Sequence, residues 1–332
     1  MTRISLVAAL GLCVAAAPMH SNAQAPVVVQ SIGLENAFMM VPMYVMKDKK
    51  FDLARGVDLQ MRMFANIEAV YQAMRAGDSD MGPAGWTNAV QWRATGSPWT
   101  IVYPQALGAG VEVLVPKDSP LKTLADLKGK KVASYAGPTG TATILFRTLL
   151  ADHFGFDPEK SNLLQYGSAP VLINALKRGE IDALVLLDPL ATRLTASGDV
   201  RSISNLVADY ESKTGKKMFW IAWVAHEKLI KRDPQAITKV LAAYQDAMDF
   251  LDKNPDEWKK YAKATGLEGA GFDLLVERTK RDLKVEWNQR WIDDLQAFTA
   301  RASAVLGKDV FPPALSPGTA TLEYNPKQEQ LQ

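Results

Sequence analysis

The chain has 332 residues, of which 48% are hydrophobic and 22% charged. These proportions are ordinary for a globular protein and exclude an intrinsically disordered chain, and the length suits two domains better than one. The formal net charge of +2 comes from 38 basic and 36 acidic residues without a long block of like charge. We therefore expect no nucleic acid among the partners of this protein.

The first 23 residues have the layout of a secretory signal peptide. Arg3 precedes an apolar run over residues 4–17, and Ser21-Asn22-Ala23 supplies an end of the A-x-A type. The alternative, a membrane anchor, is disfavoured because spanning a bilayer takes about 20 apolar residues. We expect cleavage near Ala23 and export to the periplasm.

The single cysteine, Cys13, lies inside this segment. It follows Leu12, where a bacterial lipoprotein would carry a small residue. The mature chain is therefore expected to hold itself together by packing alone, with no disulfide and no thiolate site.

Elements alternating between strand and helix are predicted in the first part of the mature chain. Asn66 is a favourable helix N-cap, an apolar face with helical spacing follows it, and Gly77 is a typical helix end. The alternation is typical of a parallel sheet with helical crossovers. The predicted elements are a strand over 27–30, a helix over 38–47, a strand over 57–64, a helix over 67–76 and a strand over 80–85.

The same five elements are predicted a second time further along the chain. They are a strand over 131–135, a helix over 142–154, a strand over 163–166, a helix over 171–177 and a strand over 181–187. Residues 64–86 align with residues 166–188 without a gap, and Gly77 and Asp80 fall on Gly179 and Asp182. We interpret the repeat as two similar α/β lobes.

The remaining segments join or extend these lobes. Strands are predicted over 99–104 and 111–115, the second of them crossing to lobe two, and a strand over 218–225 carries the chain back. Helices follow, beginning at Asp233 with Pro234 in the first position, and are expected to pack on lobe one. The expected organisation is lobe one over 26–114 and 218–310, lobe two over 115–217, and an irregular tail over 311–332.

Ligands of open parallel sheets bind outside the carboxyl ends of the strands, so two facing lobes predict a cleft there. The loops at these ends are residues 34–38, 85–88, 137–141 and 188–190. The candidate ligand-binding residues in these loops are Asn36, Phe38, Met39, Gly85, Trp86, Thr139, Gly140, Thr141 and Asp188.

The loop over 137–141, Gly-Pro-Thr-Gly-Thr, carries the clearest chemistry. Backbone N–H groups at a helix N-terminus, the positive end of the helix dipole and two threonine hydroxyls can hold an anion without a charged side chain. The Lys-Ser/Thr pair of a phosphate-binding P-loop does not follow. A plain helix start remains the alternative.

Trp86 and Asp188 occupy equivalent positions of the repeat. Trp86 can cover an apolar ligand body or belong to the core. Asp188, before Pro189, can serve as a turn former or helix cap. As a site residue it can accept a hydrogen bond from a ligand amine or hydroxyl, or tie the lobes together on closure. Trp220 and Trp223, on the returning strand, are assigned to the core.

The sequence contains no recognisable catalytic motif. The three histidines, His20, His153 and His226, are scattered, and there is no G-x-S-x-G, H-E-x-x-H or cysteine cluster. We therefore predict neither an enzyme nor a bound metal or cofactor.

Residues 115–120 and 124–133 (V-P-K-D-S-P and L-A-D-L-K-G-K-K-V-A) resemble the lobe-crossing segment of solute-binding proteins of ABC importers. The similarity is to the nitrate/sulfonate/taurine and thiamine-pyrimidine type. The loop at 137–141, the A-L-x-x-G-x-I-D-A turn at 175–183 and Asp188-Pro189 match that pattern too.

The resemblance implies a type II periplasmic binding protein, with two Rossmann-like lobes, a two-crossing hinge and a helical C-terminal extension on lobe one. It implies a monomer that captures a small organic anion, a sulfonate or carboxylate with an apolar or aromatic body. A permease in the inner membrane would then receive the ligand. Gly140-Thr141 replaces the Ser-Asn type loop of many sulfonate binders, which leaves the headgroup open.

Two alternatives come from other classes. Pyrimidine-precursor synthases share the fold, but these enzymes are intracellular, use pyridoxal phosphate and need a reactive histidine and a cysteine-bearing motif. Export and the absence of cysteine from the mature chain disfavour that interpretation. A binding protein that presents its ligand to a receptor is the other alternative.

Overall fold

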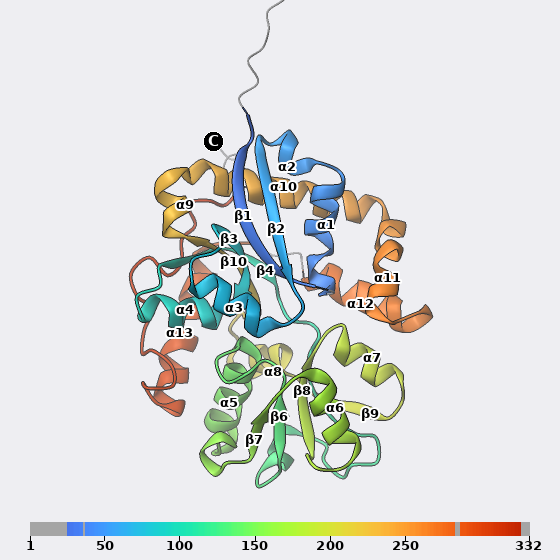
Figure 1. The fold of residues 1–332 in the computed structure, drawn as a ribbon. Helices are drawn as coiled ribbons and strands as arrows, with labels where there is room; N and C mark the ends of the chain where they lie inside the picture. The colour runs from blue at the N-terminus through green and yellow to red at the C-terminus, as the bar shows by residue number, and fades with distance from the viewer. Residues whose placement is uncertain (1–24, 36, 283–285, 327–332) are drawn as a thin grey trace, which may run out of the picture.

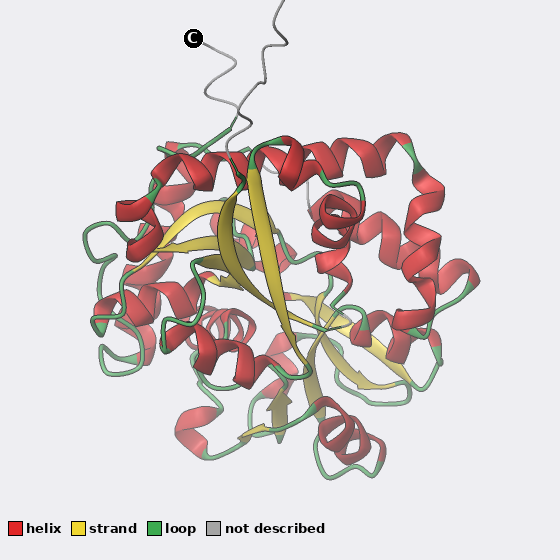
Figure 2. Ribbon diagram, turned by 45° about the horizontal axis from the view of Figure 1, so that its top comes forward, coloured by secondary structure: helices red, strands yellow, loops and turns green. Residues whose placement is uncertain are grey.

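The computed structural model describes residues 25–35, 37–282 and 286–326. The predicted signal peptide and Asn36 lie outside these residues. The chain forms two lobes, one above the other in Figure 1, and each lobe consists of a sheet with helices against it (Figure 2). None of the helices in the described ranges is long and apolar enough to cross a membrane.

Lobe one is built from both ends of the described chain. Its first part contains β1 (Val27–Leu34), η1 (Phe38–Met40), α1 (Val41–Asp48), α2 (Phe51–Ala54), β2 (Val57–Phe64), α3 (Ile67–Arg75), β3 (Met81–Gly85), α4 (Trp86–Ala94) and β4 (Trp99–Ala106). The chain returns to it with β10 (Ile221–His226), α9 (Glu227–Arg232) and α10 (Pro234–Lys253). Then follow η4 (Pro255–Tyr261), α11 (Ala262–Thr265), α12 (Gly269–Asp282) and α13 (Gln289–Leu306).

Lobe two is continuous in sequence. It contains β5 (Val111–Pro116), η2 (Leu124–Leu127), β6 (Val132–Ser134), α5 (Thr141–Phe154), η3 (Glu159–Ser161), β7 (Leu164–Tyr166), α6 (Ala169–Lys177), β8 (Ala183–Leu187), α7 (Leu190–Ala196), β9 (Val200–Asn205) and α8 (Leu206–Thr214). The five strands form one sheet in the order β7-β6-β8-β5-β9, in which β5 runs antiparallel to both neighbours.

Lobe one repeats this arrangement with a split sheet. β1 and β2 pair in parallel, and β10 runs antiparallel between β3 and β4. β1 lies beside β3 (Figure 1), so the spatial order β2-β1-β3-β10-β4 matches that of lobe two. The prediction of two similar α/β lobes is therefore confirmed.

The aspartate of the repeated turn has the same structural role in both lobes. The Asp80 carboxylate accepts the N–H of Gln30 at 3.0 Å, and the Asp182 carboxylate accepts the N–H of Lys131 at 2.8 Å. Each aspartate thus joins the first strand region of its lobe to the third. Gly77 has a φ of +78°, a left-handed conformation that favours glycine at this helix end.

The boundary between the lobes differs from the one expected at residues 114 and 115. That boundary falls inside β5, which pairs along its length with β8 and β9 and so belongs wholly to lobe two. The chain crosses instead in residues 107–110, between β4 and β5, and returns in residues 215–220, between α8 and β10. We call these two segments the hinge.

The C-terminal helices, which were expected to pack on lobe one, contact lobe two as well. α10 packs on α1 and α2, but α12 packs against α7 and α13 lies along α5. The Arg301 guanidinium forms an ion pair with Asp152 of α5. Described residues beyond α13 form neither helix nor strand, apart from one bridge between Ile101 and Ala320.

Candidate ligand-binding cavity between the lobes

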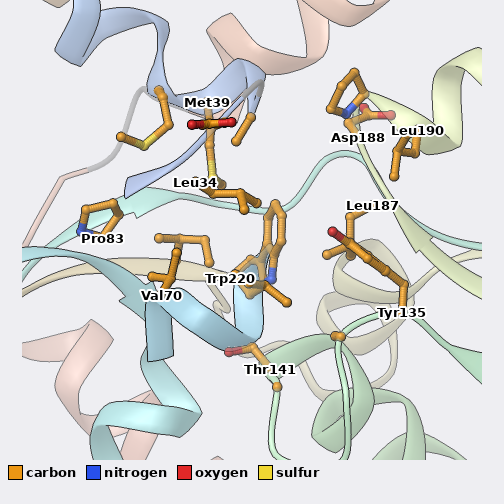
Figure 3. Close-up of a pocket in the computed structure, with 18 of the residues that line it drawn as sticks. Leu34, Met39, Val70, Pro83, Tyr135, Thr141, Leu187, Asp188, Leu190 and Trp220 are labelled. Atoms are coloured by element: carbon orange, nitrogen blue, oxygen red, sulfur yellow. The ribbon is translucent and has the colours of Figure 1, made fainter. Parts of the chain in front are cut away.

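A cavity of about 320 Å³ lies between the two lobes, and Figure 3 shows side chains of both lobes around it. Its walls are mainly apolar. Lobe one contributes Leu34, Met39, Ile67, Val70 and Pro83, and lobe two contributes Tyr135, Leu187 and Leu190.

The cavity lies where the strand ends of the two lobes meet. Leu34 ends β1 and Leu187 ends β8, while Tyr135 directly follows β6. The carboxyl ends of parallel strands share one sheet edge, so the repeat places equivalent loops around one space. The position of the cavity agrees with the cleft expected from the sequence.

Trp220, assigned to the core from the sequence, instead lines the cavity. It is half-buried at the end of the returning hinge segment, whereas Trp223 is fully buried. The phenol of Tyr135 points toward the Trp220 indole (Figure 3), and burial raises the pKa of the Tyr135 hydroxyl. Residues i and i+3 of a strand face opposite sides, which is the signal that could have separated these two tryptophans.

The predicted anion loop is engaged with the other lobe. On α4, Thr87 Oγ1 donates to the carbonyl of Thr139 at 3.1 Å and lies 3.1 Å from Thr141 Oγ1. Asn88 Nδ2 donates to Thr139 Oγ1 at 3.2 Å, and Gln91 Nε2 donates to the Thr139 carbonyl at 3.1 Å. The loop therefore ties the two lobes together beside the cavity.

Only part of this loop reaches the cavity. Gly140 and Thr141 line it, and Gly140 is the N-cap of α5 without a side-chain cap hydrogen bond. Thr139 is exposed and is not among the lining residues. The positive end of the α5 dipole is therefore directed toward the cavity.

Replacing Thr87 by valine removes the cross-lobe hydrogen bonds of a fully buried hydroxyl at nearly constant shape. The two hydrogen bonds contribute about 1 kcal/mol each, so we expect ligand affinity to fall about thirtyfold through a less favourable lobe closure. Isothermal titration measures the change. Thr95→Val is the matched control, because among the described residues the Thr95 hydroxyl bonds only to carbonyls of α4. An equal loss of affinity in both variants would contradict this role of Thr87.

Asp188 lines the cavity, but its carboxylate is already bound by protein groups. Oδ1 accepts the N–H of Thr192 at 2.9 Å and the Thr192 hydroxyl at 2.7 Å, in the first turn of α7. Oδ2 lies 3.5 Å from Nη1 of Arg278 on α12. The Asp188 carboxylate thus stabilises the first turn of α7 and pairs with an arginine of the C-terminal extension, while its contact with a ligand stays a prediction.

Arg278 joins the extension to lobe two through a second carboxylate. Its Nη2 lies 3.1 Å from Oε1 of Glu112, a residue of β5 that is 4% exposed. Burial raises the pKa of both Glu112 and Asp188, and the guanidinium of Arg278 opposes that shift. The buried carboxylate of Glu112 and the half-buried carboxylate of Asp188 thus share one arginine.

Trp86 does not reach the cavity, in contrast to its expected place opposite Asp188. Its side chain is fully buried and packs edge-on against Phe298 and Phe311 at centroid distances of 5.2 and 6.3 Å, and against Phe219. Residues of α13 and the tail cover this position in lobe one. The repeat itself gave no information about that cover, because Phe298 and Phe311 lie outside the repeated segments.

Of the other candidate residues in lobe one, some line the cavity and some do not. Met39 lines the cavity, whereas Phe38 is 4% exposed and packs against Trp258 and Phe272. Gly85 is not a lining residue; a Cβ there would lie 2.6 Å from Asn88 Oδ1 and 2.9 Å from Thr141 Oγ1. Gly85 thus permits the close approach of the lobes.

Comparison with known proteins identifies the family. Residues 37–258, more than half of the chain, match the family described as NMT1/THI5 like, and the chain belongs to that family. A Brucella abortus protein named as a binding protein is 26% identical over 202 residues, which are 61% of this chain and 60% of that protein. The Saccharomyces cerevisiae 4-amino-5-hydroxymethyl-2-methylpyrimidine phosphate synthase THI5 is 25% identical over 233 residues, 67% of this chain and 66% of that enzyme.

Solved structures share the fold at low sequence identity. The alkanesulfonate-binding protein SsuA of Xanthomonas axonopodis, bound to MOPS, superimposes with a TM-score of 0.73 at 20% identity, covering 90% of this chain and 99% of SsuA. The periplasmic nitrate-binding protein NrtA of Synechocystis gives a TM-score of 0.69 at 15% identity, over 92% and 89% of the two chains. The expected type II periplasmic binding protein fold is confirmed.

Proposed function

We propose that this protein is an extracytoplasmic solute-binding protein that captures a small organic anion in the interlobe cavity and delivers it to an ABC importer. The observation that carries the proposal is the cavity itself, of about 320 Å³, whose walls come from both lobes and from the hinge. A ligand held in this way is enclosed only when the lobes are together. Ligand binding therefore favours the closed arrangement, by hinge motion of the kind known in periplasmic binding proteins.

The fold of the sulfonate- and nitrate-binding neighbours supports this class of function. The predicted signal peptide supports export to the periplasm, and a permease of the inner membrane is the partner proposed to receive the ligand from a monomer. The apolar walls support a ligand whose body is apolar or aromatic. The acid group is a sulfonate or a carboxylate.

An enzyme of the pyrimidine-precursor synthase type is the second candidate, because THI5 is a relative. Such an enzyme holds pyridoxal phosphate through a lysine Schiff base. Among the described residues, none that lines the cavity is a lysine, histidine or cysteine. The lining residues therefore do not fit that cofactor, and this favours the binding protein.

A thermal-shift screen of the purified protein tests the proposal. The set contains benzoate, benzenesulfonate, butanesulfonate, nitrate and 4-amino-5-hydroxymethyl-2-methylpyrimidine, with glucose as the control. A ligand at 100 times its Kd stabilises the folded state by about 2.7 kcal/mol, so at least one organic anion should raise the melting temperature while glucose does not. No shift with any of the anions would contradict the function, and a shift with the pyrimidine alone would favour the second candidate.

A further inference from the structure

The charged side chains around the cavity differ in whether they have a hydrogen-bond or ion-pair partner in the protein. Three charged residues line it within the described part of the chain, namely Glu35, Asp188 and Arg193. The Asp188 carboxylate is matched by Thr192 and Arg278. By contrast, no described residue forms a hydrogen bond or an ion pair with the Arg193 guanidinium.

Arg193 lies at the solvent side of the cavity. Most lining residues are buried or half-buried, but Arg193, Glu35 and the small Ala65 are exposed. Arg193 stands on α7 of lobe two, three residues after Leu190, which is one helical turn away on the same face and also lines the cavity. Its guanidinium passes close to the backbone of Gly266, at the end of α11, where a Cβ would lie 3.4 Å from Nη1.

Among the described residues, none with a cationic side chain lines the inner part of the cavity. Trp220, Tyr135 and Val70 form an apolar and aromatic lining there (Figure 3). In the predicted anion loop, the Thr141 hydroxyl is bonded to that of Thr87 on α4, and Thr139, whose Oγ1 accepts from Asn88 Nδ2, does not line the cavity. An unpaired guanidinium at the mouth and an apolar interior are complementary to an amphiphilic anion.

We infer that Arg193 holds the acid group of the ligand at the cavity mouth, while the apolar or aromatic body of the ligand lies inside between Trp220 and Tyr135. The planar guanidinium fits a carboxylate or sulfonate through two parallel N–H···O bonds. This inference rests on the proposed function and names its ligand class and its specificity residue. It places the acid group on α7 rather than at the N-terminus of α5.

The ligand should be a monoanion. Glu35, on the lobe-one side of the mouth, adds a negative charge that no described side chain neutralises by a hydrogen bond or an ion pair. A second acid group on the ligand would meet this carboxylate or enter the apolar interior without a partner. Both placements are unfavourable.

Titration calorimetry of the full protein and of Arg193→Gln provides the test, with benzoate, benzenesulfonate and butanesulfonate as anionic probes. Benzamide and benzenesulfonamide are the uncharged probes of the same shape, and terephthalate is the dianion. The control variant is Arg178→Gln, which makes the same charge change on lobe two at an exposed site outside the cavity lining. We expect Arg193→Gln to weaken the best anion at least tenfold and Arg178→Gln to change it less than twofold.

The expected pattern has two more parts. Uncharged probes should bind at least tenfold more weakly than their anions and lose little in Arg193→Gln, and terephthalate should bind more weakly than benzoate. Equal affinity for anions in the protein and in Arg193→Gln would overturn the role of Arg193, and equal affinity for benzoate and terephthalate would overturn the monoanion. In both cases the proposed function stands, because an anion still binds; failure of every anion to bind the unmodified protein overturns the function as well.

Discussion

Replacing Trp86 by alanine should lower the free energy of unfolding by about 3–5 kcal/mol, the cost of truncating a large buried aromatic side chain. The indole is fully buried among Phe219, Phe298 and Phe311, so the substitution leaves a void where α4, the returning strand region and α13 meet. Urea denaturation measures the change as a lower midpoint at nearly constant slope.

Trp220→Ala is the matched comparison, because the same side chain is removed from a half-buried position in the cavity wall. This variant should lose less stability than Trp86→Ala but weaken ligand binding about tenfold, which corresponds to about 1.4 kcal/mol. The opposite result, in which Trp86→Ala keeps its stability but binds the ligand more weakly, would indicate that Trp86 contacts the ligand and would contradict its assignment to the core.

Replacing Arg278 by methionine should lower the free energy of unfolding by about 2–3 kcal/mol at neutral pH. Breaking a fully buried ion pair costs about 3–5 kcal/mol. The expected effect is smaller because 22% of the Arg278 side chain is exposed. The variant leaves the carboxylates of Glu112 and Asp188 without their cation.

The deficit of this variant should depend on pH in a defined direction. A carboxyl whose pKa is raised in the folded state binds more protons there than in the unfolded chain, so its contribution to stability falls as pH rises through the interval between the two pKa values. Burial raises the pKa of Asp188 above its ordinary value of 3.8 and the pKa of Glu112 above its ordinary value of 4.5. Loss of Arg278 raises both pKa values further. The deficit should therefore be largest near pH 7 and shrink as pH falls toward those values.

Urea denaturation between pH 4 and pH 7 measures this dependence. Arg281→Met is the control on the same helix, since Arg281 is exposed, and it should change stability by less than about 0.5 kcal/mol. A deficit for Arg278→Met that stays constant across this range would mean that lost packing, rather than charge, accounts for its effect.

The local pattern of the sequence was sufficient for most of the fold. Asn66 caps α3 as predicted, with its side chain accepting the N–H of Ala69 at 2.9 Å. The aligned Asp80 and Asp182 marked two turns that the structure builds alike. These features depend on residues close in sequence or on one neighbouring strand, which is why periodicity and caps reveal them.

The lobe boundary and the extension depend on contacts that no local pattern encodes. β5 belongs to lobe two because it pairs with β8 and β9, and a strand of the same composition could as well extend the first sheet. α13 has an apolar face, but the sequence does not say that this face meets α5. The prediction placed Trp86 at the cavity for the same reason. Phe298 and Phe311 cover Trp86, and no local pattern of the sequence encodes these contacts.

The candidate site was predicted where strand ends and loops define it. Met39, Gly140, Thr141 and Asp188 line the cavity, as strand-end positions should. Arg193 and Trp220 were missed because one lies within a helix and the other at the hinge, outside the loops that parallel-sheet geometry highlights. Asp188 lines the cavity as predicted, but its ion pair with Arg278, a residue 90 positions further along the chain, could not be predicted from the local sequence.

A crystal structure of the protein with the tightest-binding anion of the screen tests the central claim most directly. We predict ligand density in the interlobe cavity, with the body of the ligand between Trp220 and Tyr135 and with the lobes in contact through Thr87 and the loop at 137–141. A ligand bound elsewhere on the protein, with the interlobe cavity free of it, would contradict the account.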